Sequence, residues 1–248
     1  MDIFVQAKNG IPYNVNAFNA LEGFGELGYP IQLFEPSEIF KISLSETSII
    51  VGGIATVQTA LERLFINVPE PLDYPPELKA YTGRNIEIRT LSDLLTNNVT
   101  PYFAKPATLQ ASLKGTVINN ERDLINFRDL PPETLMYVSE LVQFQCEYRV
   151  FVLNRRPFAC KHYRGNSLIF PDSRVVLEAI EAYSSSPIAY ALDVGVTDRG
   201  DTLLVEINDG YSLGSYGLLP IAYARFIEAR WKEFWGLPFE MNYPASFA

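Results

Sequence analysis

The first 68 residues alternate between short apolar runs and amphipathic segments. Runs of apolar residues predict three strands, and segments with apolar positions three or four residues apart predict two helices. The strands are expected at residues 1–6, 30–34 and 49–53, and the helices at residues 14–27 and 54–64. Strands that alternate with helices favour parallel βαβ pairing. The pattern therefore predicts a small N-terminal α/β unit.

A proline-rich segment at residues 68–78 follows this unit. Its sequence, VPEPLDYPPEL, holds four prolines in eleven residues. Proline removes a donor from a β-ladder and blocks a continuing helix, so the segment is expected to be a linker or a rigid loop. We place a domain boundary here, with a first domain at residues 1–78 and a second at residues 79–248.

Beyond the linker the apolar runs are mostly short and predict a different architecture. Short strands are expected at residues 102–105 and 113–118, three successive antiparallel strands at 135–141, 146–153 and 158–163, and a hairpin of residues 189–196 and 202–207. Helices are expected at residues 121–127, 172–183 and 218–234, the last of them long and amphipathic.

Composition limits the classes of function. Of the 248 residues 48% are hydrophobic, which indicates a packed globular protein, and the net charge of -9 argues against nucleic acid as a non-specific partner. A single histidine, His162, nearly closes off multi-histidine zinc sites and Ser–His–Asp catalysis. Cys146 and Cys160 lie in apolar runs, which disfavours a disulfide framework. Without a membrane-length apolar run or a signal-peptide pattern, we expect a cytoplasmic protein that does not bind membranes.

Carboxylates interrupt both strands of the predicted hairpin. Asp193 lies in the first strand, and Glu206 and Asn208 lie in the second. Residues two apart on a strand point to the same face, and pairing about the turn brings Asp193 close to that face. Three oxygen ligands on one face form a site of the kind that Mg²⁺ uses with nucleotide phosphates. The alternative is that the two acids lie at strand ends by chance.

Basic residues within strand-like runs could face such phosphates. The candidates are Lys105 in YFAKP, Lys114 in SLKG, Arg149 in CEYRVFVL, and Lys161 and Arg164 in ACKHYRG. A buried lysine or arginine is costly unless an anion pairs with it. For each residue taken singly, a solvated sheet edge is the alternative.

The junction of two predicted strands, in VSELVQFQCEYR, could hold a nucleotide base. Backbone groups of Glu140–Val142 would read the base edge while apolar side chains cover its faces. Glu147 offers two acceptor oxygens for ribose hydroxyls and shares a strand face with Arg149, so both are expected to enter one cleft.

Taken in order, these segments resemble the ATP-grasp superfamily, in particular the clade characterised by one arginine and two lysines. The resemblance is carried by FAKP, LKG, SELVQFQCEYRVFV and LDVGVTDRGDTLLVEINDGYSLGSYG, over roughly residues 100–220. It implies an α+β fold: a small N-terminal α/β domain, then an ATP-grasp domain with mostly antiparallel sheets. That domain would consist of a lysine-bearing subdomain at residues 79–138 and a metal-binding subdomain at residues 139–248.

The resemblance also implies a role for each candidate residue. Nucleotide binding would fall to Lys105 and Lys114 at the α- and β-phosphates, Glu140, Leu141 and Val142 at the adenine, and Glu147 at the ribose. Asp193, Glu206 and Asn208 would hold one or two Mg²⁺ ions, and Arg149 and Lys161 would face the γ-phosphate and the intermediate formed from it. The segment PATLQASLKG departs from many relatives, because it has no glycine before Gly115.

The implied function is ATP-dependent ligation of a carboxylate to an amine or thiol through an acyl phosphate. The expected substrates are small carboxylates and amines, such as an amino acid, or a peptide or protein terminus, and the oligomeric state stays open. Backbone N–H groups of residues 209–217, DGYSLGSYG, could receive the substrate carboxylate, or the segment could be a simple connection. Two other functions are a nucleotide-binding sensor without ligase activity and a phosphotransferase.

Overall fold

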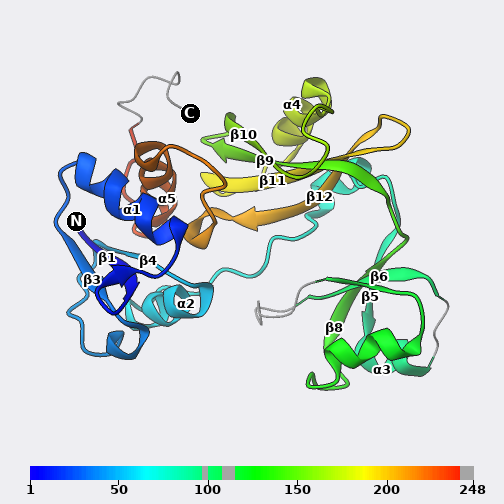
Figure 1. The fold of residues 1–248 in the computed structure, drawn as a ribbon, viewed down its shortest axis with the longest axis horizontal. Coiled ribbons are helices and arrows are strands. Elements are labelled where there is room, and N and C mark those ends of the chain that lie inside the picture. Colours follow the sequence, from blue (N-terminus) through cyan, green and yellow to red (C-terminus); the bar gives the residue numbers. More distant parts are fainter. Residues whose placement is uncertain (97–99, 108–114, 241–248) are drawn as a thin grey trace.

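The computed structural model describes residues 1–96, 100–107 and 115–240, which form three packed parts (Figure 1). The N-terminal part is a parallel sheet in the order β3 (Ile31–Phe34), β1 (Asp2–Lys8), β4 (Ser48–Val51). A short strand, β2 (Ile11–Pro12), pairs antiparallel with the end of β1. The helices are α1 (Val15–Glu26), which Asn14 caps, and α2 (Ile54–Arg63). These elements lie where the apolar pattern predicts them.

The last helix of the chain, α5 (Pro220–Phe234), returns to the N-terminal part and packs against α1 (Figure 1). A Cβ on Gly23 of α1 would lie only 2.0 Å from the carbonyl oxygen of Pro220, so the two helices approach closely because this residue is glycine. The helix lies where the sequence predicts it, and most of its residues are buried. It joins the N-terminal core to β9 and β11 of the next part.

The large sheet consists of four antiparallel strands in the order β10 (Arg156–Gly165), β9 (Phe144–Leu153), β11 (Ala189–Thr197), β12 (Thr202–Asp209). Helix α4 (Ser173–Ala182) covers one face, where its apolar residues pack on those of β9 and β11. The opposite face is left to α5 and to a cavity. Cys146 and Cys160 are free thiols.

The small sheet has the order β5 (Ile86–Thr90), β8 (Leu135–Ser139), β6 (Tyr102–Pro106), β7 (Thr116–Ile118). A short helix, α3 (Leu91–Thr96), packs beside it, and the sequence pattern predicted neither β5 nor α3. Residues 121–127 form a 3₁₀ helix rather than an α-helix. The expected run of three successive antiparallel strands is wrong for the first, because β8 pairs with β5 and β6 and not with β9.

A buried carboxylate holds α5 in place. Glu228 is 0% exposed and accepts hydrogen bonds from Tyr29, Arg225 and Lys232, at 2.9, 2.7 and 2.8 Å. Burial alone would raise the pKa of Glu228, but these donors lower it below the ordinary value of 4.5. Among the described residues, none of the helices is both long and apolar enough to cross a membrane.

Replacing Glu228 with Gln should lower the free energy of unfolding by about 1–3 kcal/mol at neutral pH, because two half-buried cations, Arg225 and Lys232, lose their counter-charge. A lowered folded pKa contributes stability above the unfolded pKa, and this stability is lost as the pH falls through the folded value. The difference between Glu228→Gln and wild type should therefore shrink between about pH 5 and pH 3. Urea unfolding at several pH values measures this, and a pH-independent difference would contradict it.

Candidate active site

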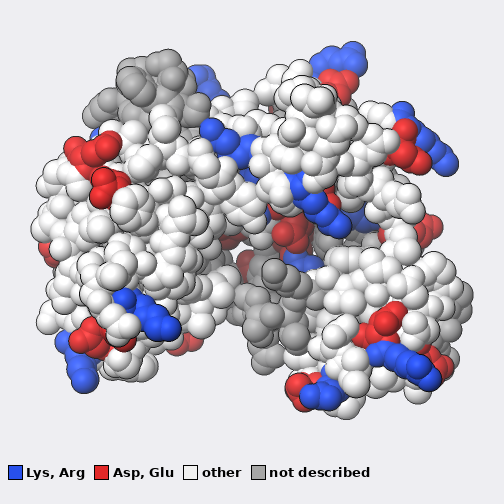
Figure 2. Space-filling model, viewed as in Figure 1, with Lys and Arg blue, Asp and Glu red and all other residues white. Residues whose placement is uncertain are grey.

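A cavity of about 660 Å³ lies where the three parts meet. Its walls are the start of α2, the linker at residues 69–74, the β6 and β7 strands, the connection after β8, and β12 with the end of β10. Figure 2 shows acidic and basic side chains in the hollow between the parts. The volume is within the range of small-molecule and cofactor sites.

Four candidate residues form one row across the large sheet. Lys161 on β10 is opposite Arg149 on β9, Arg149 is opposite Asp193 on β11, and Asp193 is opposite Glu206 on β12. Residues directly opposite in antiparallel strands point to the same face. The register therefore places two cations and two carboxylates side by side on the face away from α4.

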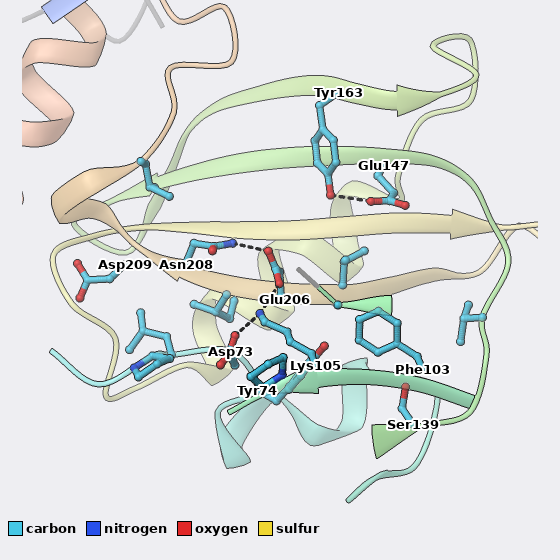
Figure 3. Close-up of a pocket in the computed structure, with 18 of the residues that line it drawn as sticks. Asp73, Tyr74, Phe103, Lys105, Ser139, Glu147, Tyr163, Glu206, Asn208 and Asp209 are labelled. Atoms are coloured by element: carbon cyan, nitrogen blue, oxygen red, sulfur yellow. Dashed lines mark hydrogen bonds and ion pairs between the residues drawn. The ribbon is translucent and has the colours of Figure 1, made fainter. Parts of the chain in front are cut away.

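The predicted metal ligands converge at one end of this row. Asn208 donates from Nδ2 to Glu206 Oε1 at 3.0 Å (Figure 3). It also donates to Asp193 Oδ2 at 3.3 Å, so its amide lies between the two carboxylates. Within the described ranges no three His, Cys, Asp or Glu side chains gather as a metal cluster. The donor set is two carboxylates and an amide, and a half-turn of the amide would present its oxygen. Oxygen donors of this kind fit Mg²⁺.

Arg149 forms a bidentate contact with the two carboxylate oxygens of Asp193. Its Nε lies 2.8 Å from Oδ1 and its Nη2 lies 2.6 Å from Oδ2. Burial raises the pKa of Asp193 to about 6, although Arg149 opposes this. Burial would lower the pKa of Arg149, but the contact with Asp193 raises it. Arg149, Asp193 and Lys161 do not line the cavity, whereas Glu147 does. The entry of Arg149 into the cleft beside Glu147 therefore stays a prediction, and in this structure the Tyr216 ring lies on the Arg149 guanidinium.

Lys105 on β6 points into the cavity and joins two carboxylates (Figure 3). Its Nζ lies 2.7 Å from Glu206 Oε2 and donates a second hydrogen bond to Asp73. Burial would lower the pKa of Lys105, but Glu206 and Asp73 raise it. The same contact lowers the pKa of Glu206 against the effect of its burial. In the ligand-free protein Lys105 thus neutralises a predicted metal ligand.

Asp73 is a site residue that the sequence reasoning missed. It lies in the linker, which is not a free spacer: Asp73 forms an isolated β-bridge with Ile207, whose N–H donates to the Asp73 carbonyl at 2.8 Å. Burial raises the pKa of the Asp73 carboxyl, although Lys105 opposes this. An acid beside a tyrosine and among four prolines was the available signal.

The other end of the cavity holds the predicted base and ribose positions. Glu140, Leu141 and Val142 line the cavity in the connection between β8 and β9, which joins the two sheets. Glu147 also lines the cavity and accepts from Tyr163 Oη at 2.8 Å (Figure 3). It accepts a second hydrogen bond from Arg164 Nη1 at 2.7 Å. Burial and the neighbouring carboxylates raise the pKa of Tyr163, so its hydroxyl is a donor.

The remaining predicted positions give a mixed result. Lys114 lies outside the described residues. Lys161 is half-buried and forms no ion pair within the described part of the chain. In the segment after β12, the N–H groups of Tyr211 and Ser215 donate to Asp209 and Asn16, so these two are not free to receive a substrate carboxylate.

Replacing Lys105 with Met should weaken ATP binding by about 1–3 kcal/mol, the scale of a charge-assisted contact. The ligand-free protein should also lose about 1–3 kcal/mol of unfolding free energy, because Asp73 and Glu206 lose the cation between them. Calorimetry and urea unfolding measure the two effects. Wild-type ATP affinity in a destabilised variant would show that Lys105 is only a brace.

Several solved structures share the fold of this chain. The chain is similar to D-cycloserine synthetase, with a TM-score of 0.59 and 11% identity over 94% of this chain and 100% of that chain. It is similar to D-alanine–D-alanine ligase from Bacillus anthracis complexed with ATP, with a TM-score of 0.57 and 13% identity over 95% and 98% of the two chains. It is also similar to N5-carboxyaminoimidazole synthetase from Staphylococcus aureus complexed with ADP, with a TM-score of 0.58 and 11% identity over 93% of this chain and 76% of that chain.

These likenesses show a common fold, and the sequence identifies the family. Residues 81–226, more than half of the chain, match the profile of an ATP-grasp domain, family 2 of the clade named for one arginine and two lysines, and the chain belongs to this family. The resemblance seen in the sequence and the expected fold class are thereby confirmed. No curated protein matches the sequence significantly.

Proposed function

We propose that the protein is an ATP-dependent carboxylate–amine or carboxylate–thiol ligase that acts on an amino acid, a peptide or a protein terminus. The observation that carries this proposal is the row of Lys161, Arg149, Asp193 and Glu206 beside a cavity that also holds Lys105. Family membership and neighbours described as ligases or synthetases, two of them holding ADP or ATP, support it.

In the proposed reaction Mg·ATP supplies a phosphoryl group that activates the carboxylate as an acyl phosphate. Asp193, Glu206 and Asn208 would hold Mg²⁺ at the phosphates. Lys105 would leave Glu206 for a phosphate when the cation takes that carboxylate, which needs no change of fold because the lysine stem already lies in the cavity. Lys114 would join Lys105 at the phosphates. The chain needs no nucleophile of its own for this chemistry.

The nucleotide would span the cavity from the connection after β8 to the carboxylates. Backbone groups of Glu140 and Val142 would read the adenine edge and Leu141 would cover it. Glu147 would exchange one of its present donors for the ribose hydroxyls. Arg149 and Lys161 would stabilise charge on the transferred group, since pre-oriented cations act most strongly in a water-poor site.

The test is ADP release from Mg·ATP in the presence of single and paired L- and D-amino acids, short peptides and small thiols, with products identified by mass spectrometry. An amide, peptide or thioester product with stoichiometric ADP supports ligation, and the Asp193→Asn variant should abolish it. A phosphorylated product would instead favour phosphotransfer. Tight Mg·ATP binding with no turnover on any acceptor would favour a sensor.

A further inference from the structure

A tight turn after β12 places an aromatic ring on the predicted catalytic arginine. The turn is Ser215–Leu218, closed by a hydrogen bond from the Leu218 N–H to the Ser215 carbonyl at 2.8 Å, and the ring centroid of its Tyr216 lies 4.3 Å from the guanidinium carbon of Arg149. Arginine stacks favourably on an aromatic face because the face carries negative charge density. The sequence reasoning considered only the backbone of this segment and gave the tyrosine no role.

The turn is anchored from outside the sheet. Ser215 is buried, its N–H and hydroxyl donate to Asn16 Oδ1 at 2.9 and 3.0 Å, and its Oγ accepts from Asn19 Nδ2 at 2.9 Å. Both asparagines belong to α1, so the N-terminal part fixes the residue next to Tyr216. This anchoring favours a fixed support over a moving lid.

The backbone of the turn is strained at Tyr216, the residue that carries the ring. Tyr216 has a φ of 46°, in the left-handed region that non-glycine residues avoid, and Gly217 follows at 81°. A Cβ on Gly214 would lie 2.9 Å from Cε2 of the Tyr216 ring, so the absence of a side chain there makes room for the ring. Strain of this kind persists only where surrounding contacts impose it.

Asp193 occupies one edge of the Arg149 guanidinium, and the Tyr216 ring lies on its face. Nε and Nη2 bind Asp193, and Nη1 has no hydrogen-bond partner among the described residues. Tyr216 covers the guanidinium face and meets the ring of Tyr163 edge-on, with centroids 5.4 Å apart. Tyr163 in turn binds Glu147, the predicted ribose residue. One ring thus contacts groups from both the phosphate end and the ribose end of the site.

We propose that Tyr216 is a positioning residue, which holds the guanidinium plane of Arg149 so that Nη1 is directed toward the transferred phosphoryl group. This inference rests on the proposed function of Arg149. The competing explanation is that the ring only covers a buried ion pair and contributes to stability. The two explanations differ because glycine at this position relieves the left-handed strain while it removes the stacking.

The experiment compares Tyr216→Phe, Tyr216→Leu and Tyr216→Gly with wild type by thermal melting, by kcat and KM for ATP, and by the ratio of affinities for a non-hydrolysable Mg·ATP analogue and Mg·ADP. We expect Tyr216→Phe to stay near wild type, because it retains the ring. Tyr216→Leu and Tyr216→Gly should lose at least about tenfold in kcat with KM within about twofold, and the analogue-to-ADP ratio should fall. Tyr216→Gly should melt no earlier than Tyr216→Leu.

Phe65→Gly is the matched control, because Phe65 is also an aromatic residue at positive φ, 57°, but is 98% exposed and does not line the cavity. It should change melting only. The inference would be overturned if Tyr216→Leu kept the wild-type kcat and the wild-type analogue-to-ADP affinity ratio. It would also be overturned if the loss of kcat across the variants simply paralleled their loss of thermal stability. Arg149→Lys, measured in parallel, separates the proposed role of Arg149 from that of Tyr216. If Arg149→Lys also keeps the wild-type kcat, the proposed role of Arg149 is itself wrong. If wild type shows no turnover, the affinity ratio alone decides.

Discussion

Replacing Glu206 with Gln is expected to weaken Mg²⁺-dependent ATP binding by at least about tenfold while the fold persists. The change keeps the size of the side chain but removes the charge that a hard cation requires, and changes even around metal ligands commonly cost 10–100-fold, so about tenfold is a lower bound. The fold should persist because Lys105 keeps Asp73 as a partner. Asn208→Ala should have the same direction of effect, because it removes the amide that lies between Asp193 and Glu206.

Calorimetric titration of ATP with Mg²⁺ and with a chelator separates the metal effect from other losses. Both variants should approach wild type when the chelator is present, because no cation then bridges the protein and the phosphates. Glu62→Gln is the control for charge alone, since Glu62 lies exposed on α2. Unchanged Mg·ATP affinity in Glu206→Gln and Asn208→Ala together would contradict the assignment of the cation site.

The sequence predicted elements better than it predicted pairing. Strands with continuous apolar runs, such as β1 and β11, were placed within a few residues, because burial on both faces leaves an unambiguous pattern. Strand β5 was missed because Ile86–Thr90 is short and mostly half-buried or exposed, so its pattern is weak. Residues 135–141 were assigned to the wrong neighbours because their partner strands, β5 and β6, lie more than one connection away in the chain.

The site shows the same division between local and long-range information. Asp193, Glu206 and Asn208 could be brought together from the sequence, because a hairpin has one turn about which its strands pair. The contact of Asp73 with Lys105 could not, since it joins residues 32 apart through a linker with no periodic pattern. Arg164 reaches Glu147 only because a bulge after His162 interrupts the alternation of β10, and a bulge has no reliable signal in one sequence.

Arg149→Lys is expected to lower turnover by about a hundredfold, with a much smaller effect on Mg·ATP affinity. Lysine keeps one positive charge but cannot make the two parallel bonds to Asp193, and it cannot stack a planar group on Tyr216. A cation that stabilises charge mainly in the transition state affects kcat more than ground-state binding. Loss of one pre-oriented donor typically costs about 10²–10³ in rate.

The bidentate contact with Asp193 is also what a purely structural brace would show, so stability must be measured alongside turnover. Arg230 provides the matched control, because it binds Asp209 in the same bidentate way, at 2.8 and 2.7 Å, and stacks on Phe234. Arg230→Lys and Arg149→Lys should both melt earlier, since each loses one bond to a buried carboxylate. At a temperature where both variants are fully folded, only Arg149→Lys should have lost most of its kcat. Normal ATP turnover by folded Arg149→Lys would show that this arginine braces β9 against β11 and takes no part in the reaction.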